Sequence, residues 1–405
     1  MNDTIRTFLE ILRGALEGQP ARLDEDLSPE DWHRLLHLAT IHNVLPLVYE
    51  AVYAHPALVL RQELLESVKQ QVRLQVIRQA MRTEEFLQLN DRLLAAGVRP
   101  LVVKGLVCRS LYPKPDHRPS SDEDVLIRPE DFACYHQVLT EFGMATEASR
   151  EGYEVPYRKA GSPLYIELHK SLFPPEQDAY GDLNRFFEGA VSRSVEISLQ
   201  GHRVYTMEPT DHLFYLICHA FKHFLHSGFG IRQVCDIVLF ARRYGGEVDW
   251  QRIRENCRAI RAEQFAGAIF ALGDRYLGIT LPAAWQDGEV DPRPLLQDLL
   301  EGGLYGDASM SRKHSSNITL DAVAAQKSGR KAKSGWLVSA FPAKKKLEGR
   351  YPYLKKHPYL LPVAWCSRLL RYGQETRRVS DNHAAQALKI GQQRVELLKF
   401  YGIIE

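Results

Sequence analysis

HRPSSDEDVLIRPEDF, residues 117–132, places three acidic residues at the start of an apolar run. On a strand, residues i and i+2 share one face about 7 Å apart, so Asp122 and Asp124 would project together. Glu123 would then point away from them, outward to solvent. Two aspartates one residue apart are common in proteins, and a solvated entrance to a strand is the default interpretation. The pair becomes a candidate metal site only if neighbouring segments supply a third carboxylate.

A third carboxylate comes from a later apolar stretch, SPLYIELHK (162–170), which reads as a strand. Glu167 lies within it, and a carboxylate inside an apolar strand is costly unless its charge is compensated. Together with the aspartate pair it could hold divalent ions, for which carboxylate oxygens are the usual ligands. The alternative is a carboxylate at a strand edge, paired with Lys170 or Arg158.

Upstream of the aspartates, LVVKGLVC (101–108) reads as a short buried strand that turns into a helix at Lys104 and Gly105. Free N–H groups at a helix start, a glycine that permits close approach of the backbone and a nearby lysine all suit a phosphate group. We therefore expect a phosphate-binding corner at these two residues.

Periodicity along the chain alternates between helical and strand-like segments, and predicts an α+β protein. The core would be a small mixed sheet, flanked by helical domains on both sides. The expected divisions are an N-terminal helical domain (1–97), an α/β core (98–207), a helical domain completing the cleft (208–300), a basic flexible linker (301–335) and a C-terminal aromatic, basic and helical segment (336–405).

Charge is concentrated in one part of the chain, because residues 311–360 hold twelve Lys and Arg against two acids. The rest of the chain is mildly acidic, which argues against nucleic acid as a partner. The six cysteines lack CxxC spacing and fit a reducing compartment. No apolar run reaches the length of a membrane span and the start lacks the features of a signal peptide, so we expect a cytoplasmic protein.

Four histidines fall on one stripe of the expected helix DHLFYLICHAFKHFLH, namely His212, His219, His223 and His226. His219 and His223 are spaced for zinc, but a third ligand and an HExxH motif are missing. The default interpretation is a polar helix face packed against the sheet.

Two further charged residues have open interpretations. Arg118 either reaches a phosphate or neutralises nearby acids. Asp236 lies four residues after Arg232, which favours an ion pair within one helix. The prolines and tyrosines of YPYLKKHPYLLP (351–362) suggest an extended surface segment or a peptide-binding edge.

Taken in order, Lys104-Gly105, Arg118, Ser121-Asp122-x-Asp124 and IELHK (166–170) resemble the uncharacterised nucleotidyltransferase family of bacterial biosynthetic clusters, within the DNA polymerase β-like superfamily. The later DHLFYLICHAFKHF and IRQVCDIVLFARRY resemble the helical half of that family. The superfamily usually has Gly-Ser where this chain has Lys104-Gly105, and an apolar residue where it has Glu123.

The resemblance implies a magnesium-dependent reaction, with Mn²⁺ as the alternative ion. Asp122, Asp124 and Glu167 would hold the metal, and Glu167 would also accept the proton of the acceptor hydroxyl. Nucleotide contacts are then expected from Lys104, Gly105, Arg118, Ser121, Lys222 and His223.

The expected reaction transfers a nucleoside monophosphate from an NTP to a hydroxyl or phosphate of a small molecule, sugar or peptide, and releases pyrophosphate. One alternative is a metal-dependent glycosyltransferase that uses the DxD for a nucleotide-sugar. Such enzymes normally have a longer Rossmann-like half before that motif. The other alternative is a non-catalytic protein that uses the same fold to bind a peptide or partner.

Overall fold

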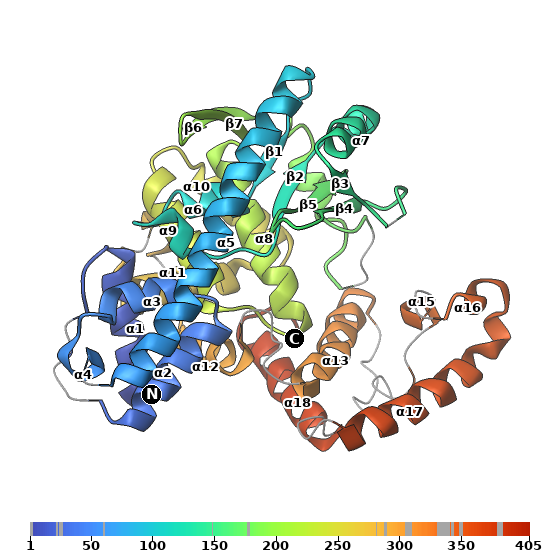
Figure 1. The fold of residues 1–405 in the computed structure, drawn as a ribbon. Helices are drawn as coiled ribbons and strands as arrows, with labels where there is room; N and C mark the ends of the chain where they lie inside the picture. The colour runs from blue at the N-terminus through green and yellow to red at the C-terminus, as the bar shows by residue number, and fades with distance from the viewer. Residues whose placement is uncertain are drawn as a thin grey trace.

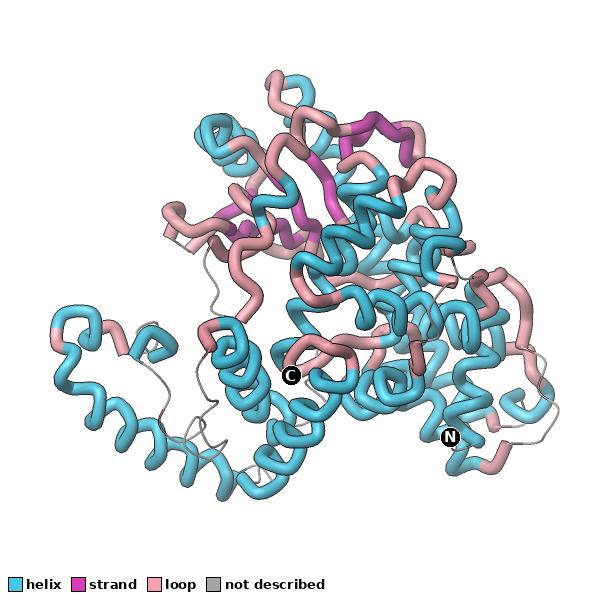
Figure 2. Tube along the Cα trace, turned by 180° about the vertical axis from the view of Figure 1, so that it is seen from behind, coloured by secondary structure: helices cyan, strands magenta, loops and turns pink. Residues whose placement is uncertain are grey.

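The computed structural model describes residues 3–21, 23, 27–59, 61–147, 149–175, 179–280, 282–286, 290–303, 310–329, 341, 344–347, 351–378 and 384–405. Helices lead into a sheet and helices follow it (Figure 1). Seen from behind, the strands gather at one end of the molecule and helices fill the rest (Figure 2). The expected α+β class is confirmed.

The N-terminal helices are α1 (Asp3–Leu16), α2 (Pro29–Ile41), α3 (Leu45–Val52), α4 (Pro56–Val59) and α5 (Gln62–Ala95). Helix α2 begins as its sequence predicts. The Ser28 hydroxyl accepts the Asp31 N–H at 3.1 Å, and Pro29 occupies the first helical position.

Helix α5 runs 34 residues and crosses the sheet region (Figure 1). Its buried polar side chains bond to backbone of the core. Gln79 accepts the Ser120 N–H at 2.8 Å, and Asn90 donates to the Arg203 carbonyl at 2.8 Å. The helix therefore anchors the loop that precedes the aspartate pair.

Seven strands form one mixed sheet in the order β3-β4-β5-β2-β1-β7-β6. They are β1 (Leu101–Val103), β2 (Glu123–Leu126), β3 (Met144–Ala145), β4 (Glu154–Lys159), β5 (Tyr165–His169), β6 (Val195–Leu199) and β7 (His202–Thr206). Short helices α6 (Gly105–Arg109) and α7 (Phe132–Glu141) connect them. Strand β2 lies at the centre, antiparallel to β1 and parallel to β5.

The helices after the sheet are α8 (Pro209–His226), α9 (Ile231–Tyr244), α10 (Trp250–Ala259), α11 (Glu263–Leu277), α12 (Arg293–Gly302), α13 (Met310–Lys327), α15 (Lys344–Leu347), α16 (Tyr353–Lys356), α17 (Leu361–Arg378) and α18 (Ala384–Phe400). One apolar core runs from Phe8 in α1 through the sheet to Ile404, so the helical parts and the sheet are packed as one body.

Part of the range expected as a flexible linker, 301–335, is instead helix α13; residues 304–309 and 330–335 lie outside the described part. The helix packs on the end of α8 and supplies partners for its last carbonyls. Thr319 donates to the Leu225 carbonyl at 2.8 Å, and Arg312 donates to the Ser227 carbonyl at 2.8 Å. Tertiary contacts therefore override the polar, turn-like composition.

The segment 351–362, expected to be extended, forms helix α16, the 3₁₀ turn Pro358–Leu360 and the start of α17. It has a small apolar cluster of its own, built around Leu354 and Ala364. In Figure 1, α15 to α17 form an arm beside the main body. None of the described helices is long and apolar enough to cross a membrane.

Candidate active site

The candidate site lies where the central strands β2 and β5 run side by side. Their parallel register sets Asp124 opposite Glu167, as a carboxylate pair from neighbouring strands requires. His169 follows two residues later on β5, so its side chain shares the face of Glu167. The alternation of side chains on both strands thus brings three potential ligands to one face of the sheet.

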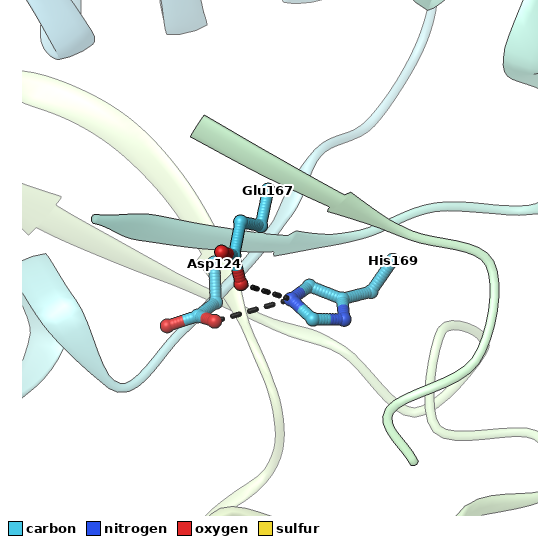
Figure 3. Close-up of side chains that lie close together, drawn as sticks. All are labelled: Asp124, Glu167 and His169. Carbon is cyan, nitrogen blue, oxygen red and sulfur yellow. Dashed lines mark hydrogen bonds and ion pairs between the residues drawn. The ribbon is translucent and has the colours of Figure 1, made fainter. Parts of the chain in front are cut away.

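The side chains of Asp124, Glu167 and His169 converge (Figure 3). His169 Nε2 lies 3.1 Å from Asp124 Oδ1 and 3.6 Å from Glu167 Oε2. One ligand atom from each of the three residues lies within 4.8 Å of the other two. Tyr165 donates its hydroxyl to Glu167 Oε1 at 3.2 Å, which orients that carboxylate.

Lys104 is the strongest charge partner of this cluster, because its ammonium lies 2.7 Å from Asp124 Oδ2. Burial alone would raise the pKa of Asp124, but Lys104 and His169 overcome burial and hold that pKa well below its usual value. Burial also disfavours charge on His169, yet its bonds to Asp124 and Glu167 raise the pKa of His169 to about 9. Lys104 and His169 therefore offset the negative charge of the carboxylates.

The residues fit a divalent cation. Asp124 Oδ2 is buried, and its partner is the Lys104 ammonium. Two carboxylates and an imidazole form a mixed oxygen and nitrogen donor set. Magnesium prefers oxygen donors, whereas imidazole suits transition metals better. The donor set therefore gives weight to the Mn²⁺ alternative.

Asp122 precedes β2, is half-buried, and accepts a hydrogen bond from Ser121 at 3.2 Å. It does not belong to the cluster that Asp124 forms with Glu167 and His169 among the described residues. Ser121 itself is exposed. A metal held by Asp124 would need the short segment before β2 to bring Asp122 closer.

Glu123 was expected to face solvent, and this is wrong. It points away from the aspartates as the strand alternation predicts, but into the interior, where its side chain is fully buried. Its carboxylate lies 2.6 Å from an Arg109 guanidinium nitrogen and accepts the Leu106 N–H at 3.0 Å. Because the sheet is covered on this face by α6, an acid here needs a buried cation, and Arg109 supplies it.

The Lys104-Gly105 corner differs from a simple phosphate loop. One of the N–H groups at the start of α6, that of Leu106, is already bound by Glu123. A side chain at Gly105 would place Cβ 2.3 Å from the Glu123 carboxylate, so the glycine makes room for that acid. Lys104 has a φ of +58°, a region that a lysine seldom adopts.

Helix α8 presents a basic face to the cluster. Lys222 and His223 are half-buried there. Burial and the charge of Lys104 lower the pKa of Lys222, while Glu154, Asp124 and Glu167 oppose that change. Burial, together with Lys222 and Lys104, lowers the pKa of His223 to about 3. Lys222 therefore lies within electrostatic reach of the carboxylates, and His223 is neutral.

Arg118 serves charge neutralisation in this structure. It is 2% exposed and binds Asp236 with two bonds, of 3.0 and 2.6 Å. Tyr112 donates to the same carboxylate at 2.8 Å. Asp236 thus has Arg118 as its ion-pair partner, and Arg232, expected to pair with it, donates to the Pro119 carbonyl instead. The network ties the segment before β2 to helix α9.

Sequence reasoning missed His169 as a candidate ligand. The signal was present in IELHK, since Glu and His two residues apart on a strand share a face. It also missed that His212 and His219 contact Lys104, which required knowledge of how α8 crosses the sheet. Of the two alternative partners expected for Glu167, Arg158 stacks on Tyr165 and Lys170 donates to the Arg150 carbonyl.

Comparison with known proteins shows which family the chain belongs to. A family model described as "Uncharacterised nucleotidyltransferase" matches residues 28–278, more than half of the chain. Among solved structures, the antibiotic-resistance factor ANT(2'')-Ia is similar at 13% identity, with 46% of this chain and 96% of that chain covered and a TM-score of 0.33. An antigenic nucleotidyltransferase-like protein from Paracoccidioides brasiliensis is similar at 12% identity, covering 49% and 92%, with a TM-score of 0.29. No curated protein matches the chain.

Proposed function

The chain belongs to the uncharacterised nucleotidyltransferase family, and from that premise we propose that it transfers a nucleoside monophosphate from an NTP to a hydroxyl or phosphate acceptor, with release of pyrophosphate. The acceptor would be a small molecule, a sugar or a peptide side chain in the cytoplasm. The observation that supports the reaction most is the pairing of Asp124 and Glu167 on adjacent strands, with the Lys104 ammonium 2.7 Å from Asp124.

Asp122, Asp124 and Glu167 would hold Mg²⁺ or Mn²⁺, with His169 as a further ligand. A bound divalent ion at this site lowers the pKa of the attacking hydroxyl and neutralises phosphate charge. Glu167, 23% exposed at its side chain, would accept the proton of the acceptor hydroxyl. Tyr165 keeps one Glu167 oxygen occupied and leaves the other toward the cluster.

Lys104 and Lys222 would bind the triphosphate. Both carry positive charge on the side of the cluster that faces α8, and Lys222 forms no ion pair or hydrogen bond among the described residues. A lysine ammonium that is half-buried without a partner gains most when an anion arrives. His223, neutral beside Lys222, can contact the phosphate or the acceptor. Ser121 and Gly105 would add further contacts to the nucleotide.

The direct test is calorimetric titration of each NTP in the presence of Mg²⁺ or Mn²⁺. We expect metal-dependent binding of at least one NTP to the wild type, and its loss in Asp124→Asn and in Glu167→Gln. Glu130→Gln is the matched control, because Glu130 is exposed in the 3₁₀ turn Pro129–Asp131 that follows β2. Binding of a UDP-sugar but of no NTP would favour a glycosyltransferase. Absence of binding to either would favour a non-catalytic role.

A further inference from the structure

The backbone of Lys104 is held by a buried chain of hydrogen bonds. Its N–H lies 3.0 Å from His212 Nε2, and His212 Nδ1 lies 3.1 Å from the Thr206 hydroxyl. Thr206 in turn donates to the Val102 carbonyl at 2.7 Å. Because an N–H can only donate, His212 Nε2 must accept, so the proton is on Nδ1 and is donated to Thr206. Each hydrogen bond in this series therefore has a fixed donor and a fixed acceptor.

This series of hydrogen bonds ends at Lys104, whose backbone conformation is unusual. Lys104, with φ +58° and ψ −106°, is the N-cap of α6 and has a backbone conformation that a non-glycine residue keeps only where its neighbours hold it. His212 is fully buried, and burial lowers its pKa to about 3. It therefore stays neutral and remains an acceptor over the whole physiological pH range.

The ammonium of the same lysine meets a second histidine. His219 Nε2 lies 3.3 Å from Lys104 Nζ. An ammonium can only donate, so His219 must also present an unprotonated nitrogen. His212 and His219 are seven residues apart, two turns of α8, and hence lie on one face of the helix. One helix thus holds both ends of Lys104.

We propose that His212 and His219 are positioning residues that fix Lys104 for its exchange between Asp124 and the nucleotide triphosphate. This inference rests on the proposed function. When a metal binds Asp124, the ammonium must leave the carboxylate 2.7 Å away. His219 keeps the ammonium at the site, while His212 prevents the backbone from relaxing, so that Lys104 is available to a phosphate oxygen.

Two pairs of variants test whether the accepting nitrogen of each histidine, rather than the bulk of its side chain, holds Lys104. His219→Leu and His212→Leu remove the accepting nitrogen, whereas His219→Gln and His212→Gln place a carbonyl oxygen near the position of Nε2. His42→Leu is the matched control, because His42 is also fully buried and burial lowers its pKa to about 4, but it lies among the N-terminal helices. If His212→Leu does not fold, His219→Leu and Thr206→Val still test the proposal.

The first measurement needs no nucleotide. In protein carrying ¹³C at lysine Cε, the Lys104 signal is assigned by its loss in Lys104→Met. We expect it to move in His219→Leu and Thr206→Val, to stay in His42→Leu, and to return toward its wild-type position in His219→Gln. A Lys104 signal unmoved in both His219→Leu and Thr206→Val, or moved equally in His42→Leu, overturns the proposal.

The second measurement is NTP affinity with saturating metal, using the NTP that binds the wild type best. We expect a loss of about tenfold or more in His219→Leu, as for a hydrogen bond to a charged group, and recovery in His219→Gln. Equal affinity in His219→Leu and wild type overturns the proposal. If the wild type binds no NTP, the proposed function fails, and the lysine signal still decides whether the histidines hold Lys104.

Discussion

Replacing Lys104 by methionine should strengthen metal binding and weaken nucleotide binding in the same protein. The ammonium is the closest cation to Asp124, and a metal ion needs the same carboxylate oxygen. Methionine keeps the length and the apolar stem but removes the charge. The two effects have opposite signs, which a general loss of folding cannot produce.

The expected changes in stability and in metal affinity follow from the burial of the Lys104–Asp124 ion pair. Unit charges 2.7 Å apart attract by about 6 kcal/mol at an effective dielectric constant of 20, which is an upper bound. Removing one partner from a buried pair costs about 3–5 kcal/mol in practice. His169 still donates to Asp124 at 3.1 Å in the variant, so we expect about 3 kcal/mol of lost stability without metal. A metal ion no longer has to displace the ammonium, and its affinity should rise about 10- to 100-fold.

The assay is calorimetric titration of Mn²⁺ into nucleotide-free protein, followed by titration of the NTP at saturating Mn²⁺. Lys114→Met is the control, because Lys114 is 55% exposed at its side chain and its partner is Glu50, away from the site. Equal or weaker Mn²⁺ binding in Lys104→Met would refute the idea that the ammonium occupies the metal position. Unchanged NTP affinity would refute its role at the triphosphate.

Three further predictions concern charge, burial and helix ends. A metal ion would bind His169 only in its neutral form, and the pKa of His169 is about 9. Mn²⁺ affinity should therefore rise by up to tenfold per pH unit between about pH 6.5 and 9. Mn²⁺ titrations of His169→Gln at several pH values should lose this dependence. The raised pKa also implies that the contribution of His169 to metal-free stability is complete below about 6.5 and is lost as pH rises through 9. Glu123→Gln leaves Arg109 charged and unpaired in the interior and should cost about 3–5 kcal/mol by denaturant unfolding. Thr319→Val deprives a buried α8 carbonyl of its donor and should cost about 1 kcal/mol, against almost nothing for the exposed Thr140→Val, whose hydroxyl bonds its own helix.

Local patterns were enough to predict much of the fold. The stretch 62–97 has few helix breakers, and Ser28 followed by Pro29 is a standard helix start; both patterns predict helices where the structure has α5 and α2. Alternation along two short apolar stretches placed Asp124 and Glu167 on strands, and the structure sets them opposite each other. These features depend on residues close in sequence, which is where periodicity carries information.

Features that depend on distant packing could not be predicted. Nothing near Glu123 in the sequence shows that Arg109 lies beneath it, because the pair exists only once α6 folds back on β2. The same holds for α13, whose Thr319 and Arg312 are explained by the carbonyl groups at the end of α8. His212 was visible as a polar residue on a helix, but its role depends on the crossing of α8 over Lys104.

The two departures from the usual superfamily pattern, Lys-Gly at the corner and an acid between the aspartates, belong to one arrangement. Glu123 fills the space beside Gly105 and takes the Leu106 N–H, a group that a phosphate would otherwise use. With that N–H already bound, the corner offers a phosphate one backbone donor fewer. On the proposed function, phosphate recognition would fall to side chains on the opposite face of β2, where Lys104 lies. We infer that the lysine at the corner compensates for the backbone donor that Glu123 has taken, and that this is why its backbone is held so firmly from α8.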